Sequence, residues 1–137
     1  MFDAYKIRKD FPILDRLIEG KRNTYLDTAA SAQKPFVMLE EIRKAYLDEY
    51  ANVHRGSYWL SEKATENYEK ARQSAAHFIN AEKPEEIIFT RSATEGINLV
   101  AATFGAMTLK PGDEILLSRA EHHANLVTWQ QWAAKTG

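Results

Sequence analysis

The sequence predicts an α/β domain with a largely parallel sheet, and three observations support this class. The residues after Pro84 alternate short apolar runs with segments of helical spacing, in the order strand, helix, strand, helix. The runs EIIFT (86–90) and EILLS (114–118) show no polar alternation, as expected for strands covered by helices on both faces. Of the 137 residues, 45% are hydrophobic and 27% are charged, which is typical of a globular chain.

Two helices are predicted before Pro84. Residues 36–50 and 61–79 both carry apolar side chains at close to helical spacing, with charged side chains between them. The segment that separates them, ANVHRGSYWL (51–60), breaks this pattern with an asparagine and a glycine. A weaker strand candidate, TYLDT (24–28), precedes the first of these helices.

Two further helices are predicted after the first apolar run. TEGINLVAATF (94–104) places apolar residues at i, i+3, i+4 and i+7, and ANLVTWQQWAAK (124–135) is helical in composition. The last helix runs up to Gly137, and three strand candidates are fewer than an α/β sheet usually contains. We therefore expect the front part of a larger domain, with an incomplete sheet that leaves the isolated chain poorly soluble or partly unfolded.

Charge and hydropathy exclude several classes of partner. The formal net charge of −1 gives no general attraction to nucleic acid or to an anionic membrane. No apolar run approaches the roughly 18 residues that span a bilayer. The charged start of the chain does not resemble a secretory signal, so we expect a cytoplasmic protein. The chain has no cysteine, and disulfides and thiol chemistry cannot come from these residues.

The segment FTRSATEGINLV (89–100) contains a candidate anion site. Ser92 and Glu95 form the S-x-x-E capping pattern, which predicts a helix that starts at Ser92 directly after a strand. Unpaired N–H groups and the helix dipole favour an anion there, and Thr94 adds a hydroxyl. Gly96 would allow a ligand to approach the backbone closely. The alternative is an ordinary helix cap that binds nothing, with Gly96 serving only to make room for packing.

Glu121, His122 and His123 follow the run EILLS directly. Ligands of open α/β sheets bind beyond the carboxyl ends of the strands. If the strands are parallel, these residues share one rim with the turn at 92–94. A histidine ring that stacks on a flat ligand and a helix start that holds its phosphate would then form one pocket.

A metal site is not expected from the histidines. Neighbouring side chains on a helix point apart, and zinc-binding helices instead place two histidines at i and i+4. Nothing local requires His54 to converge with these histidines in space. A structural role for either His122 or His123 remains an alternative, and His77 is interpreted as structural or exposed.

Several segments together resemble one family, the class V aminotransferase-fold enzymes. The similarity is greatest to the cysteine desulfurases of the SufS type, which depend on pyridoxal 5′-phosphate (PLP). The matching segments occur in the family's order and cover nearly the whole chain. They are DFPIL (10–14), YLDTAASAQKP (25–35), ANVHRGSYWLSEKATENYEKAR (51–72), EEIIFTRSATEGINLVA (85–101) and PGDEILLSRAEHHANLVTWQ (111–130). The resemblance implies a fold type I PLP-dependent transferase, with residues 1–24 as an amino-terminal helical segment and 25–137 as the front part of the PLP-binding large domain.

The resemblance also implies roles for residues on the cofactor side. His122 would stack on the PLP ring and is a candidate proton carrier, whereas the role of His123 is less defined. Ala93 and Thr94 would hold the phosphate through backbone N–H groups and the Thr94 hydroxyl. The position of Ala93 is often a threonine in relatives, so one hydroxyl is missing here and phosphate binding should weaken modestly.

On the substrate side, the resemblance places Ala29 and Ala30 in a turn that lines the site. His54 and Arg55 would lie on a loop near its mouth. The site lies close to the dimer interface in this family, so a homodimer is expected. A protein that accepts the sulfur is a further expected partner.

The reaction implied is the PLP-dependent conversion of L-cysteine to L-alanine, with sulfur passed to an enzyme persulfide for iron–sulfur cluster assembly. The family's Schiff-base lysine, its pyridine-pairing aspartate, its catalytic cysteine and its substrate-binding arginine all lie further downstream. The 137-residue chain alone is therefore expected to be inactive.

Three alternatives remain open. Selenocysteine lyases and cysteine sulfinate desulfinases share these motifs. The other two alternatives are a non-catalytic interaction module that pairs with a full-length relative, and an α/β domain of another purpose.

Overall fold

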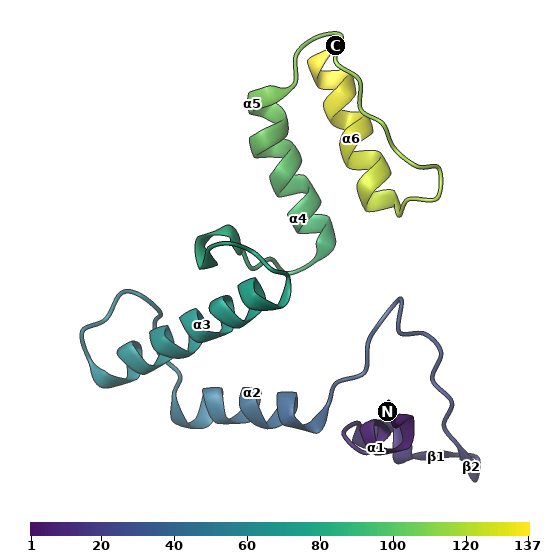
Figure 1. Ribbon diagram of the computed structural model, residues 1–137, viewed down its shortest axis with the longest axis vertical. Coiled ribbons are helices and arrows are strands. Elements are labelled where there is room, and N and C mark those ends of the chain that lie inside the picture. The colour runs from purple at the N-terminus through teal and green to yellow at the C-terminus, as the bar shows by residue number, and fades with distance from the viewer. The chain divides into compact units, whose positions relative to one another are not determined.

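The computed structural model describes residues 1–137, which form two compact units, residues 1–84 and 85–137 (Figure 1). This division differs from the one expected at residue 24, and the assignment of 25–137 to a PLP-binding domain stays a prediction. None of the helices is both long and apolar enough to cross a lipid bilayer.

The first unit begins with short elements. Helix α1 (Ala4–Arg8) is capped by the Asp3 carboxylate, which accepts hydrogen bonds from two backbone N–H groups of the first turn. A 3₁₀ turn follows at Pro12–Asp15, and strands β1 (Leu17–Ile18) and β2 (Lys21–Arg22) form an antiparallel hairpin. Its two turn residues both have positive φ, as type I′ turns require.

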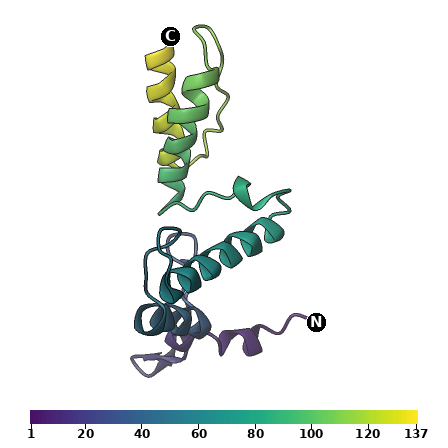
Figure 2. The same cartoon turned by 90° about the vertical axis from the view of Figure 1, so that its left-hand side faces the viewer.

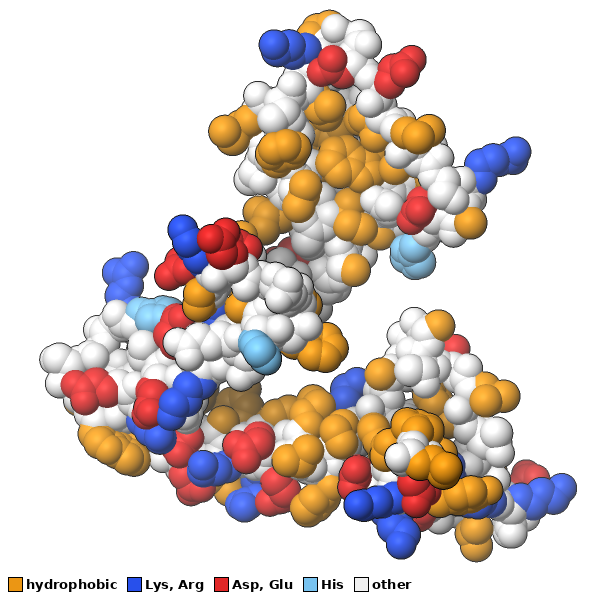
Figure 3. Space-filling model, in the orientation of Figure 1, with side chains coloured by type: hydrophobic (Ala, Val, Ile, Leu, Met, Phe, Trp, Pro, Cys, Tyr) orange, Lys and Arg blue, Asp and Glu red, His pale blue; other side chains and the backbone are white.

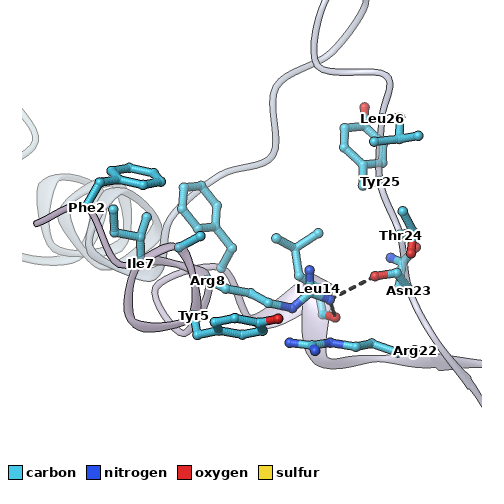
Figure 4. A pocket seen from close by; sticks show the side chains of 12 residues that line it. Phe2, Tyr5, Ile7, Arg8, Leu14, Arg22, Asn23, Thr24, Tyr25 and Leu26 are labelled. Carbon is cyan, nitrogen blue, oxygen red and sulfur yellow. Dashed lines mark hydrogen bonds between the residues drawn. The ribbon is translucent and has the colours of Figure 1, made fainter.

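A hollow of about 490 Å³ lies beside α1 (Figure 4). Its wall is held together by Arg8, whose guanidinium donates to the carbonyl oxygens of Leu14 and Asn23, the latter at 2.8 Å. The guanidinium of Arg22 lies over the Tyr5 ring, 5.5 Å from its centroid. The Arg8 side chain thus joins three segments of the amino-terminal region: its own helix, the turn at Leu14 and the segment at Asn23.

Two longer helices complete the first unit. Helix α2 (Phe36–Asp48) and helix α3 (Trp59–Phe78) confirm the helices predicted for 36–50 and 61–79. The backbone N–H of Phe36 donates to the Asp10 carbonyl oxygen at 2.6 Å, which ties the start of α2 to the amino-terminal segment. A 3₁₀ turn at Pro84–Glu86 spans the boundary between the units.

The second unit is a pair of helical rods. One rod joins helix α4 (Ala93–Val100), a π-helical turn (Ala101–Gly105) and helix α5 (Ala106–Thr108), and the other is helix α6 (His123–Thr136). They lie side by side in both ribbon views (Figures 1 and 2). A Cβ atom on Gly105 would lie 3.4 Å from the Trp129 ring, so a glycine permits this close packing.

The predicted strands at 24–28, 86–90 and 114–118 do not form in this chain, whose sheet consists of β1 and β2 alone. A strand is stabilised by ladder hydrogen bonds to a neighbouring strand, and none of these segments belongs to the two-stranded sheet. Ile87 is buried, but Leu26, Ile88 and Phe89 are exposed and Leu116 is almost fully exposed. Hydrophobic side chains are visible over both units (Figure 3). The expected poor solubility of the isolated chain stays a prediction.

Candidate functional site

The start of α4 has the cap that the sequence predicts. Ser92 is extended, with φ −163° and ψ 162°, and its Oγ accepts a hydrogen bond from the Glu95 N–H at 3.2 Å. The Ser92 carbonyl oxygen accepts from the Gly96 N–H at 3.1 Å. The N–H groups of Ala93 and Thr94, together with the Thr94 hydroxyl, have no acceptor in the chain. Three donors therefore remain at this helix start for an anion.

The Glu95 side chain binds the backbone N–H of Arg91, one residue before the N–H group that the capping pattern predicts. Its Oε2 accepts from the Arg91 backbone N–H at 2.7 Å and from the Arg91 guanidinium at 3.2 Å, rather than from the Ser92 N–H. The side-chain and backbone hydrogen bonds from Arg91 lower the pKa of the Glu95 carboxyl. Because Arg91 balances this negative charge, the carboxylate does not oppose an anion at the adjacent donors.

The start of α6 is capped by a histidine, which the sequence pattern did not reveal. His122 is extended, and its Nδ1 accepts a hydrogen bond from the Ala124 N–H at 3.1 Å. Since Nδ1 is the acceptor, the hydrogen of the neutral ring is on Nε2. The ring of His123 lies edge-on to that of His122, with an interplanar angle of 89°. The cap thus fixes the His122 ring, while the residue as a whole is exposed.

Both helix starts lie at the same end of the helix pair (Figure 1). An open hollow of about 350 Å³ lies between the rods, lined by Ala93, Gly96, Ile97, Val100, Asn125 and Trp129. A Cβ atom on Gly96 would meet only the Thr90 hydroxyl, at 3.6 Å. The structure therefore places Ala93, Thr94 and His122 at the same end of the helix pair, and Ala93 also lines the mainly apolar groove.

Asn125 is a polar group of this groove that sequence reasoning missed. Its Nδ2 donates to Glu121 Oε2 at 3.0 Å, and its Oδ1 accepts from the Trp129 indole N–H at 2.9 Å. The three residues follow at i, i+4 and i+8, a spacing that was visible in the sequence. Their chain of hydrogen bonds stiffens the first two turns of α6, directly behind His122.

The predicted substrate-side residues belong to the first unit. Ala29 and Ala30 lie in an exposed turn in which the Asp27 carbonyl oxygen accepts from the N–H groups of Ala30 and Ser31, at 3.2 and 3.0 Å. His54 and Arg55 lie on the loop before α3, as expected, and both are exposed.

Comparison with known proteins identifies the family. The sequence profile of class V aminotransferases matches residues 24–137. The chain belongs to the class V aminotransferase family. A probable cysteine desulfurase of Synechocystis is 53% identical over 134 residues, which cover 98% of this chain and 32% of that protein. A cysteine desulfurase of Cronobacter sakazakii is 50% identical over 136 residues, or 99% and 34% of the two chains.

A solved structure agrees with this assignment. The apo cysteine desulfurase of Thermococcus onnurineus NA1 superposes with a TM-score of 0.88 at 40% identity, over all of this chain and 32% of that one. The amino-terminal part of a fold type I PLP-dependent transferase, which the sequence resemblance implied, is thereby confirmed as the fold class of this class V aminotransferase chain. The chain spans about a third of the length of the curated relatives it matches.

The residues at the two helix starts fit the cofactor of this family. PLP carries a phosphate and a flat pyridine ring. The unpaired donors of Ala93 and Thr94 suit the phosphate, and the exposed ring of His122, held by its own hydrogen bond, offers a flat stacking surface. Ala93 offers its backbone N–H alone.

Proposed function

We propose that these residues form the phosphate- and ring-binding wall of a PLP-dependent cysteine desulfurase, which releases the sulfur of L-cysteine and leaves L-alanine. The observation that carries the proposal is the position of two unpaired N–H groups and the Thr94 hydroxyl at the same end of a helix pair as His122. The cysteine desulfurases among the relatives supply the substrate.

In this proposal each residue has a separate task. Ala93 and Thr94 bind the phosphate, and His122 stacks on the ring. The hydrogen bond from the Ala124 N–H to Nδ1 keeps the His122 ring in one orientation and makes Nε2 its hydrogen-bearing atom, which can hand a proton to a neighbouring group. PLP, when bound, supplies the electron-withdrawing ring that makes the bonds of an amino-acid substrate labile.

The substrate-side residues extend the proposal. Ala29 and Ala30 line the substrate side of the site, and His54 and Arg55 lie on a loop near its mouth, as the family resemblance implies. We place the enzyme in the cytoplasm as a homodimer that passes its sulfur, through an enzyme persulfide, to an acceptor protein for iron–sulfur cluster assembly. The 137 residues contain no cysteine, so we propose that this chain alone does not complete the reaction.

The direct test uses the product of the native gene, purified with PLP. Incubation with L-cysteine and a reductant should yield alanine and sulfide in equal amounts, while the 137-residue chain under the same conditions yields neither. Parallel reactions with L-selenocysteine and L-cysteine sulfinate distinguish the related activities. Turnover of either compound at a far higher kcat/KM than that of cysteine would assign the protein to that activity instead. PLP binding without alanine formation from any of the three would contradict the proposal.

A further inference from the structure

The loop before α3 holds a histidine in a costly backbone conformation. His54 has φ +67°, in the left-handed region that side chains other than glycine rarely adopt. Such strain persists only where surrounding contacts determine it, and it is often found at functional sites.

Several contacts with α3 determine this conformation. The His54 N–H donates to the Thr65 hydroxyl at 2.8 Å, and that hydroxyl donates to the Ser61 carbonyl oxygen at 2.7 Å. The fully buried Ser61 hydroxyl donates to the Asn52 carbonyl oxygen at 2.6 Å. A Cβ atom on Gly56 would lie 2.5 Å from Ser61 Oγ, so the loop packs directly on the helix.

The imidazole ring of His54 is held as firmly as its backbone. Nε2 lies 2.7 Å from Glu69 Oε1, and the ring meets the Tyr68 ring edge-on, with centroids 5.4 Å apart. The other oxygen of Glu69 lies 3.3 Å from Arg72 Nε, and Arg72 also lies over the Tyr68 ring. Glu69, Tyr68 and Arg72 are thus the charged and titratable groups that surround this ring.

This geometry determines which ring nitrogen of His54 is left for a ligand. A carboxylate only accepts hydrogen bonds, so Nε2 of His54 carries a hydrogen and is held by Glu69. Nδ1 is therefore the ring nitrogen that remains for a ligand. His122 shows the reverse arrangement, because its Nδ1 is occupied by the Ala124 N–H. The side chain of His54 is 47% exposed.

We propose that Glu69 is a positioning residue that fixes the His54 ring so that Nδ1 faces an α-amino acid substrate and hydrogen-bonds its ammonium or carboxylate group. This inference rests on the substrate-side role of His54 in the proposed function. The ion pair is too exposed to contribute much to folding. Its main effect is on ring orientation and on which nitrogen carries the permanent hydrogen.

The test compares two glutamates of the same helix in the native gene product with PLP bound. Glu69→Ala removes the acceptor, whereas Glu69→Gln keeps an amide oxygen in its place. Glu66→Ala is the matched control, since Glu66 pairs with Lys63 and Lys70 and does not contact His54. Ring nitrogen NMR of ¹⁵N-histidine-labelled protein reports the hydrogen on Nε2, and the His54 signal is identified by its loss in His54→Asn.

The expected result is specific to Glu69→Ala. That variant should lose the slowly exchanging Nε2 hydrogen and raise the KM for L-cysteine about tenfold, with a smaller change in kcat. Glu69→Gln should retain most of both properties, and Glu66→Ala should retain all of them. An intact Nε2 signal and KM in Glu69→Ala, or an equal loss in Glu66→Ala, would overturn the inference.

Failure of the proposed function is distinguishable from failure of this inference. If the wild-type protein turns over no cysteine, the proposed function fails and the Nε2 signal alone decides whether Glu69 positions His54. If His54→Asn leaves the KM unchanged, the substrate contact through Nδ1 is wrong, whatever the NMR signal shows.

Discussion

The starts of α3 and α4 use their polar groups in opposite ways. At α3 no side chain caps the first N–H groups, and the hydroxyls of Ser61 and Thr65 instead bond to the preceding loop. At α4 Ser92 caps the Glu95 N–H, while the N–H groups of Ala93 and Thr94 stay unpaired. One helix start is occupied in holding a loop of its own chain, and the other is open to a ligand.

The glycines of the two regions show the same contrast. Gly56 is pressed against α3, and a Cβ atom there would lie 2.6 Å from the Tyr58 ring as well as against Ser61. Gly96 borders open space, apart from the Thr90 hydroxyl. A glycine in one region is required by packing within the chain, whereas in the other it leaves the backbone accessible. The following variants test this distinction.

Gly56→Ala should have the largest effect. The added methyl group overlaps atoms of Ser61 and Tyr58, so the loop must move, and overpacking of this kind lowers the free energy of unfolding by about 1–3 kcal/mol. Urea denaturation of the native gene product measures it. Stability equal to that of the wild type would show that the loop is not packed on α3 as described.

Thr94→Val should weaken PLP binding about tenfold, because it removes one hydrogen bond to the phosphate and leaves the backbone donors. The Kd is measured by fluorescence titration of the apoprotein. Thr103→Val is the control, since its hydroxyl donates to the Leu99 carbonyl oxygen of its own helical rod. An equal loss in both variants would contradict the assignment of the anion site to the start of α4.

Gly96→Ala should raise the free energy of unfolding of the apoprotein by up to about 1 kcal/mol, because alanine favours helix and the new Cβ atom makes only an ordinary contact. The same urea titration gives the value. A loss of stability would place Gly96 in the same class as Gly56 and remove the contrast between the two helix starts.

Acidification should have the smallest effect on the free energy of unfolding. The effect should be greater for the carboxyl of Glu66 on α3 than for that of Glu95 on α4. Hydrogen bonds from Lys70 and Lys63 lower the pKa of Glu66 from 4.5 to about 2, and those from Arg91 lower that of Glu95. A carboxyl with a depressed folded-state pKa contributes stability above its unfolded pKa, and that contribution disappears as the pH falls from about 4.5 towards 2.

Glu66→Gln should therefore be less stable than the wild type at pH 6 and equal to it near pH 2. Thermal unfolding across this pH range measures the difference. A gap that persists at pH 2 would mean that the effect of the substitution is not electrostatic.

The sequence predicted the helices well because their signals are local. The spacing of apolar residues located α2 and α3, and Ser92 located the start of α4. The strands were wrong for this chain because a strand depends on a neighbour, and an apolar run such as 114–118 carries no information on whether that neighbour is present.

The features of the candidate site also differ in how far they could be predicted from local sequence. The sequence argument for a common rim of His122 and Thr94 depended on parallel strands, which do not form in this chain. The hydrogen bond from the Ala124 N–H to His122 was not predictable, since histidine is an unusual cap. The left-handed backbone of His54 and its contact with Glu69 were not predictable either. Both depend on tertiary packing of the loop on α3, and the contact joins residues 15 positions apart.

The measurement that tests the central claim most directly is the affinity of PLP for His122→Ala and His123→Ala of the native gene product. The two residues are neighbours in sequence, yet in our account only His122 stacks on the cofactor ring. We predict that His122→Ala raises the Kd for PLP about tenfold or more and that His123→Ala leaves it unchanged. Equal affinities for the two variants, or a greater loss in His123→Ala, would contradict the site described at the starts of α4 and α6.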